Sequence, residues 1–144
     1  MINISIGKFS TRNKRLLDQI QNKTISLPFN CEECLDDSPH HMLYVLSAPV
    51  ALRSDTIKLR IRLYLKLTTG NKTNQIYAFF NPIKLFIIAL TIATIVGVVM
   101  YLVHSSLKLA LTFWIVSALF VLYITINRVK KQLYKKLVGW LKEL

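Results

Sequence analysis

The spacing of apolar and polar residues changes sharply near residue 80. Before that point apolar side chains mostly alternate with polar ones, which is the period of a strand with one buried face. After it come two long, uninterrupted apolar runs. The alternation is most regular in TIKLRIRLYLKL, residues 56–67. One face of this predicted strand is aliphatic, and the other carries Lys58, Arg60, Arg62, Tyr64 and Lys66.

Four further segments predict strands, because β-branched or aromatic residues are enriched in them and turn-forming residues separate them. They are residues 2–10, 23–29, 41–48 and 75–80. Gly70-Asn71 predicts a hairpin turn before the last of them, and residues 11–22 predict a short helix. We therefore expect a small antiparallel sheet or partial barrel with one helix. Its expected core is Ile25, Leu27, Met42, Tyr44, Leu46, Ile57, Leu59, Ile61, Leu63, Leu65 and Leu67.

The two apolar runs predict transmembrane helices. Leu85–Val103 has 19 residues without a charge and Leu109–Ile126 has 18, each long enough to cross a hydrocarbon layer of about 30 Å. Only HSSLK lies between them, so the spans, residues 84–103 and 108–127, form an antiparallel hairpin. The alternative, two buried helices of a soluble protein, requires a larger polar shell than the rest of the chain supplies.

The tail after residue 127 predicts an amphipathic helix that continues the second span. Its apolar residues recur at about one helical turn and are Val129, Leu133, Leu137, Trp140, Leu141 and Leu144. Two uses are open for this helix. In one it packs on the sheet or on the same helix of another subunit. In the other it lies in the lipid headgroup layer, anchored by Lys130, Lys131, Lys135, Lys136 and Trp140.

Together these predictions describe an α+β membrane protein. A small cytoplasmic antiparallel β domain, residues 1–82, precedes a transmembrane helical hairpin, 83–127, and a basic amphipathic helix, 128–144. The composition agrees, because 53% hydrophobic residues and a formal net charge of +12 require apolar and charged residues to be segregated. Cations crowd the open end of the hairpin, whereas its turn holds Lys108 alone. The positive-inside rule therefore predicts an inner-membrane protein with both termini in the cytoplasm.

The first span contains a ridge of small residues, Ala89, Ala93 and Gly97, on which another helix can approach closely. Thr91 and Thr94 lie beside it, and their hydroxyls either line a pore or return hydrogen bonds to their own helix. Two spans cannot enclose water, so a conducting role requires an oligomer. We expect a homo-oligomer, because symmetric assemblies of one chain are the commonest kind.

The residues that could bind a metal are Cys31, Cys34, His40 and His41, because Cys-x-x-Cys is half of a common zinc site. The usual second half is absent and adjacent histidines rarely bind one ion. We therefore expect no metal, and two reduced cysteines in an acidic loop, CEECLDD. The sequence contains no phosphate-binding glycine loop and no activated serine pattern. It predicts neither an enzyme nor a bound cofactor.

The cationic side of residues 56–67 suits a polyanion. Alternate residues of a strand lie about 6.5–7 Å apart, close to the spacing of phosphates in an extended single strand. Lys58, Arg60, Arg62 and Lys66 would bind phosphates, and Tyr64 would stack on a base or cover an aliphatic stem. The alternatives are a solvated basic surface, one that lies on anionic lipid, and one that binds an acidic protein partner.

The β domain joins the hairpin without a linker in IYAFFNPIKLFIIAL, residues 76–90. This order of parts resembles the small two-transmembrane β-domain membrane effectors of bacterial anti-phage defence systems, some of which carry the parts in reverse order. The resemblance lies in architecture and implies that a nucleotide or oligonucleotide on the basic strand changes how β domains pack and controls a pore. The same features also fit a structural or accessory subunit of a larger membrane complex.

Overall fold

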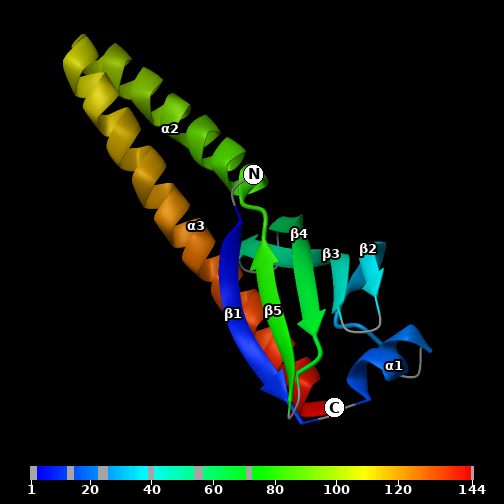
Figure 1. Cartoon of the computed structure of the whole chain (residues 1–144). Coiled ribbons are helices and arrows are strands. Elements are labelled where there is room, and N and C mark those ends of the chain that lie inside the picture. Colours follow the sequence, from blue (N-terminus) through cyan, green and yellow to red (C-terminus); the bar gives the residue numbers. More distant parts are fainter. Residues whose placement is uncertain are drawn as a thin grey trace. The chain divides into compact units, whose positions relative to one another are not determined.

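The computed structural model describes residues 3–12, 15–22, 26–38, 41–53, 57–70 and 73–143. The fold is α+β, with a five-stranded antiparallel sheet followed by two long apolar helices (Figure 1). The chain divides into two compact units. We call them the sheet unit, Met1–Asn81 with Lys130–Leu144, and the hairpin unit, Pro82–Val129.

The strands pair in the order β1-β5-β4-β3-β2, and all neighbours are antiparallel. The elements are β1 (Ile4–Thr11), α1 (Leu16–Gln21), β2 (Asn30–Ser38), β3 (His41–Arg53), β4 (Ile57–Thr68) and β5 (Asn74–Phe80). The strands predicted at 2–10, 41–48, 56–67 and 75–80 are confirmed in their described residues, which exclude residues 2 and 56, and so is the pairing of the last two. The predicted helix is present but shorter, because Thr11 still belongs to β1.

The prediction for the region before β3 is wrong in its described part. Residues 26–29 belong to no strand, and CEECLDD, expected as a loop, lies within β2. Residues 23–25 lie outside the described part of the chain. β2 is an edge strand, and its residues 31–35 are exposed. Charged side chains stay solvated there while the backbone pairs with β3, so the ladder outweighs low intrinsic strand propensity.

One face of the sheet, which we call the core face, is buried. Rows of apolar side chains cross the strands on this face. In one of them Leu46 of β3 aligns with Leu63 of β4, and Leu63 aligns with Phe80 of β5. These three side chains are fully buried. Of the predicted core, Met42, Tyr44, Leu46, Ile61, Leu63, Leu65 and Leu67 are buried, Leu27 and Leu59 are half-buried, and Ile25 and the Ile57 side chain lie outside the described part.

The C-terminal part of α3 (Leu107–Glu143) packs on the core face. Its side chains Leu133, Leu137 and Trp140 are buried. Phe9, which aligns with Ile76 in β5, contacts Tyr134 with 5.5 Å between ring centroids. Of the two uses that the sequence left open for the tail, the structure therefore contains packing on its own sheet. This helix completes a core that the sheet alone would leave open.

Gln132 of α3 takes the place of a missing strand. β2 begins opposite Ser47, so β3 extends past the end of its neighbour. In that region the backbone N–H of Ala51 donates to Gln132 Oε1 (3.1 Å), and Gln132 Nε2 donates to the Ala51 carbonyl (2.7 Å). The side-chain amide thus supplies both an acceptor and a donor, as a strand would.

Replacing Gln132 with leucine should lower the free energy of unfolding of the sheet unit by about 1–3 kcal/mol, because both backbone groups of Ala51 lose their partner. Gln132→Glu keeps an acceptor but has no donor and should recover only part of the loss. Urea unfolding in mild detergent measures this, with Trp140 as the fluorophore in a Trp114→Phe background. Equal stability of the three chains would show that the amide does not support β3.

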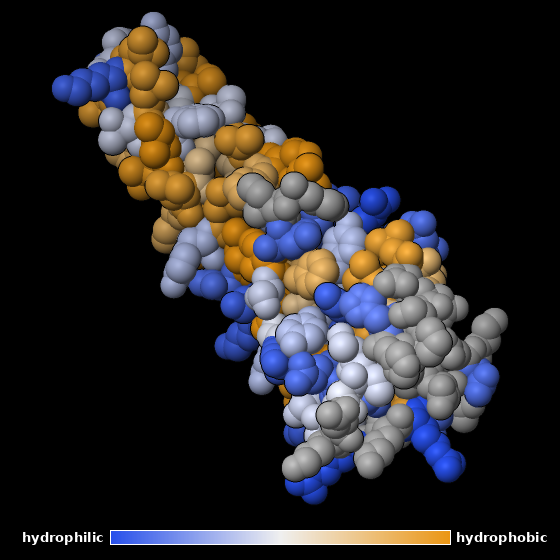
Figure 2. All heavy atoms as spheres, viewed as in Figure 1, coloured by the Kyte–Doolittle hydropathy of each residue, from blue (hydrophilic) through white to orange (hydrophobic). Residues whose placement is uncertain are grey.

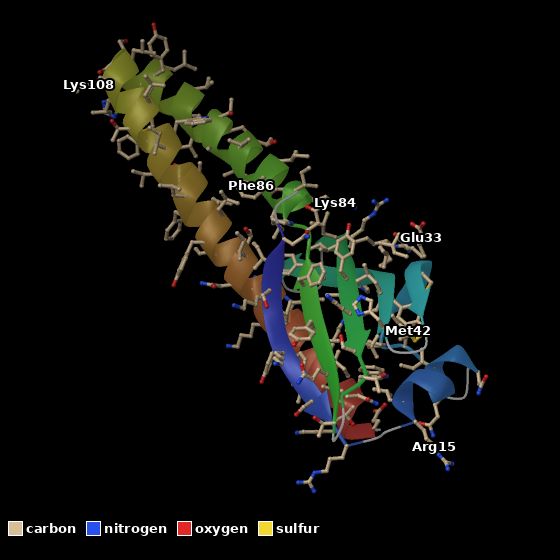
Figure 3. The ribbon with its side chains drawn as sticks, viewed as in Figure 1. Arg15, Glu33, Met42, Lys84, Phe86 and Lys108 are labelled. Atoms are coloured by element: carbon tan, nitrogen blue, oxygen red, sulfur yellow. The ribbon has the colours of Figure 1, made fainter. Side chains whose placement is uncertain are left out.

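The hairpin unit contains α2 (Ile83–His104) and the first part of α3. Two residues connect the helices where the sequence suggested five. Ser105 closes α2 in the left-handed region (φ 52°), and its N–H donates to the Tyr101 carbonyl (2.8 Å). Ser106 starts α3, because its hydroxyl accepts from the Leu109 N–H (3.4 Å). Lys84 and Lys108 lie near opposite ends of this unit (Figure 3).

Candidate functional site

The face of the sheet opposite the core face carries the cations, and we call it the basic face. On β4, Lys58, Arg60 and Arg62 are exposed, and Lys66 is half-buried. β1 adds a cation that the sequence analysis missed: exposed Lys8 aligns with Tyr77 of β5, which aligns with Lys66. Cations from two strands that are far apart in sequence therefore share one face.

Aromatic rings lie among these cations. Tyr64 stacks on Phe79, with centroids 5.3 Å apart and planes at 11°, and is only 9% exposed. Lys8 Nζ lies 5.2 Å from the centroid of the Tyr77 ring, a cation–π contact. Phe79 therefore occupies one face of the Tyr64 ring, and the tyrosine helps to cover the sheet. Contact between Tyr64 and a ligand base stays a prediction.

Carboxylates lie at the β2 edge of the basic face. Glu32 forms an ion pair with Arg62 (N–O 3.6 Å), and the two side chains are 43% and 65% exposed. Glu33 (Figure 3) aligns with Val45, which aligns with Tyr64. An ion pair this exposed contributes at most about 1 kcal/mol. An anionic ligand could displace Glu32 from Arg62 at little cost.

The two cysteines are exposed, and neither is in a disulfide. Burial raises the pKa of Cys31 above that of an ordinary thiol, and the Glu32 carboxylate adds to this; the backbone hydrogen bond to Glu33 opposes both. The Cys31 thiol donates to the Glu33 carbonyl (3.7 Å). Because the raised pKa favours the protonated thiol at neutral pH, Cys31 lacks the mark of an activated nucleophile.

Of the candidate metal ligands, the three that the structure describes do not gather into one site. His41 is the first residue of β3 and aligns with Thr68 of β4. It lies three residues before Tyr44, the residue of β3 that aligns with Cys34. His40 lies outside the described residues. Within the part of the chain that the structure describes, no three or more His, Cys, Asp or Glu side chains gather as a metal site.

The small-residue ridge of α2 is occupied within the hairpin. Ala89 and Ala93 are buried, and a Cβ atom at Gly97 would lie 3.2 Å from Cδ1 of Trp114 in α3. Trp114 Nε1 also donates to the Thr94 hydroxyl (3.2 Å). The sequence predicts the ridge but not this tryptophan, because nothing in the pattern shows which residue of α3 faces the glycine.

The span hydroxyls bond to their own helices. Thr91 donates to the Ile87 carbonyl and Thr94 to the Leu90 carbonyl, each at 2.8 Å. The hydroxyls therefore take the second of the two roles that the sequence left open, hydrogen bonding to their own helix, which needs no partner on another helix. Pore lining by Thr91 and Thr94 stays a prediction.

The outer surface of the hairpin unit is apolar. Both helices are long and apolar enough to cross a membrane, and only 17% and 11% of the residues in their most apolar stretches are buried. Large exposed side chains include Ile95, Leu102 and Tyr123, at 60%, 73% and 69%. Figure 2 shows the hairpin as a mostly hydrophobic surface. A core helix of a soluble protein would instead be largely buried.

Two of the predicted surface anchors belong to the packing of the sheet unit. Lys136 Nζ donates to the Pro49 carbonyl (3.2 Å) and lies 5.6 Å from the Phe29 ring centroid. Trp140 is 8% exposed, and its Nε1 donates to the Ser26 carbonyl (2.9 Å). The other three anchors are exposed and remain predictions: Lys130, Lys131 and Lys135.

The basic face therefore contains more than the sequence analysis found. Alternation in β5 could have placed Tyr77 and Phe79 beside the cations of β4. Lys8 was harder to place, because the register of β1 shifts between Ser5 and Gly7. Comparisons of the chain with protein-family models, with curated proteins and with solved structures found no match.

Proposed function

We propose that this chain is an inner-membrane protein whose hairpin spans the bilayer and whose basic face, in the cytoplasm, binds a nucleotide or oligonucleotide. Binding controls how copies of the chain assemble and whether their spans form a pore. This is the mode of action implied by the architectural resemblance to membrane effectors of anti-phage defence, and it rests on analogy at that level. The chain offers two routes by which ligand binding on the sheet unit can affect the spans. Helix α2 begins directly after Asn81-Pro82, and α3 is continuous through both units.

The observation that supports ligand binding is the cationic row of β4. Lys58, Arg60 and Arg62 are exposed at alternate positions, on the face opposite the one that packs on α3. Such a row presents positive charge at steps of about 6.5–7 Å, which successive phosphates of an extended strand can match. Because Tyr64 is stacked on Phe79, we expect affinity to come mainly from phosphate contacts.

The experiment measures binding of fluorescently labelled single-stranded oligonucleotides to the detergent-purified protein over a range of salt concentrations. Four phosphate contacts predict a slope of log affinity against log salt of about −2.8, at about −0.7 per contact. The variant with Lys58, Arg60, Arg62 and Lys66 all changed to glutamine should lose most of this slope and bind much more weakly. Dye leakage from liposomes that contain the protein should lose its dependence on ligand in the same variant.

The matched control removes the same number of charges from the tail, by changing Lys130, Lys131, Lys135 and Lys142 to glutamine. These lysines are exposed, and the formal net charge falls by four in both variants. The control should keep the affinity and most of the slope. If both variants lose affinity equally, binding reflects overall charge, and the assigned site is wrong.

The second candidate is an accessory subunit that binds an acidic protein segment, and one contact favours it. Glu32 already places a carboxylate 3.6 Å from Arg62, so the basic face accepts carboxylates as well as phosphates. The exposed apolar surfaces of α2 and α3 would then pack on helices of a partner. Mass measurement after gentle purification separates the two candidates: a discrete homo-oligomer supports the effector, and a monomer with a second polypeptide supports the accessory subunit.

A further inference from the structure

The stretch Cys31-Glu32-Glu33-Cys34 does not follow the register of a regular strand. Residues three apart in a regular strand point to opposite faces of the sheet. Here the register shifts between Cys31 and Glu33, so that Cys31 aligns with Leu46 and Cys34 with Tyr44. Both partners lie on the core face, two residues apart on β3. The bulge therefore places the two cysteines on one face of β2.

The acidic residues between them lie on the other face. Glu33 aligns with Val45, which aligns with Tyr64 on the basic face. Glu32 is the extra residue of the bulge, and its carboxylate contacts Arg62, also on the basic face. An ion pair and a strand register, which are independent observations, thus agree that the bulge separates two thiols from two carboxylates.

The thiols are open to a ligand. Both are exposed and neither is in a disulfide, and β2 is the edge strand of the sheet in the described part of the chain. Positions two apart on the partner strand are about 6.5–7 Å apart, near the upper limit of Cα separation for a disulfide. Two sulfur atoms at that backbone spacing can converge on an ion between them more easily than they can bond to each other.

We propose that Cys31 and Cys34 form a two-coordinate site for a soft monovalent cation, Cu(I). Thiolates select such ions, whereas zinc in proteins takes four ligands and the described residues gather no third donor beside this pair. Two Cu–S bonds form as both thiol protons pass to solvent, with no change in oxidation state. The site lies on the opposite face of β2 from Glu32 and Glu33, and it does not depend on the proposed function of the basic face.

The test is a competition between the reduced, detergent-purified full-length chain and a chromophoric Cu(I) chelator, under anaerobic conditions. We expect one Cu(I) per chain. Cys31→Ser and Cys34→Ser should each weaken binding by about a hundredfold or more, because the second thiolate no longer acts at the high effective concentration of an intramolecular ligand. Unchanged elution profiles show that these edge-strand variants remain folded.

A register control separates this site from any close pair of cysteines. The double variant Glu33→Cys, Cys34→Ser brings the thiols nearer in sequence but, by the observed register, puts them on opposite faces. It should bind as weakly as the single variants, whereas Glu33→Ala, which keeps both cysteines, should bind like the unaltered chain. Tight binding by the double variant would overturn the proposal. So would one ion for every two chains, which would mean a site between copies.

Discussion

Replacing Ile95 with lysine should prevent stable insertion of the hairpin into a membrane. Ile95 lies near the middle of α2 and is 60% exposed. On a surface that faces water, lysine at such a position costs almost nothing. In the centre of a hydrocarbon layer it costs about 2.5–3.5 kcal/mol on insertion scales. The carbonate-resistant fraction after synthesis with membranes measures the effect, and it should fall sharply.

The control for this experiment is Val103→Lys. Val103 is slightly more exposed than Ile95, at 68%, but lies one residue before the end of α2. A lysine there can extend its amine to the headgroup layer, so insertion should be nearly unchanged. If both variants insert alike, or if the unaltered chain stays in solution without detergent, the hairpin does not span a bilayer.

Truncating Phe80 to alanine should destabilise the sheet unit by about 3–5 kcal/mol. Phe80 is fully buried on the core face, where it aligns with Ile4 on one side and Leu63 on the other. The lost transfer free energy and the cavity between three strands both contribute to this loss. A loss of this size is a large fraction of the stability of an ordinary domain.

Phe79→Ala is the matched control, because the same side chain is removed one residue away on the opposite face. Phe79 is half-buried and stacks on Tyr64, so its loss should cost only about 1–2 kcal/mol. Urea unfolding followed by Trp140 fluorescence, in a Trp114→Phe background, compares the two midpoints. Equal midpoints would mean that the two faces are buried alike, contrary to the assignment of a core face and a basic face.

The sequence predicted much of this fold because its strongest signals are local. Strict alternation over residues 57–67 fixes which side chains share a face, whatever the strand pairs with. Two apolar runs with a short polar link predict a helical hairpin for the same reason. The existence of β4, β5, α2 and the tail helix, and the segregation of cations on β4, therefore needed no tertiary information.

β2 was missed because its signal is weak locally. Glutamate and aspartate disfavour strands, and only the unpaired edge of β3 makes a strand of CEECLDD. The two register shifts in β2 are equally invisible in the sequence, although the first of them, between Cys31 and Glu33, decides that Cys31 and Cys34 share a face. In the same way, the shift in β1 decided that Lys8 joins the basic face.

By itself the sequence determined the elements that a periodic pattern defines, namely alternating strands, of which β4 has one cationic and one aliphatic face, two apolar helices and an amphipathic tail. Only the tertiary structure decided that the tail packs on the sheet, with Gln132 completing the edge of β3, and that Trp114 fills the ridge at Gly97. Periodicity fixes the face on which a side chain lies. It carries no information about which distant segment covers that face, because many segments offer enough apolar surface, and strand register and close packing select one of them.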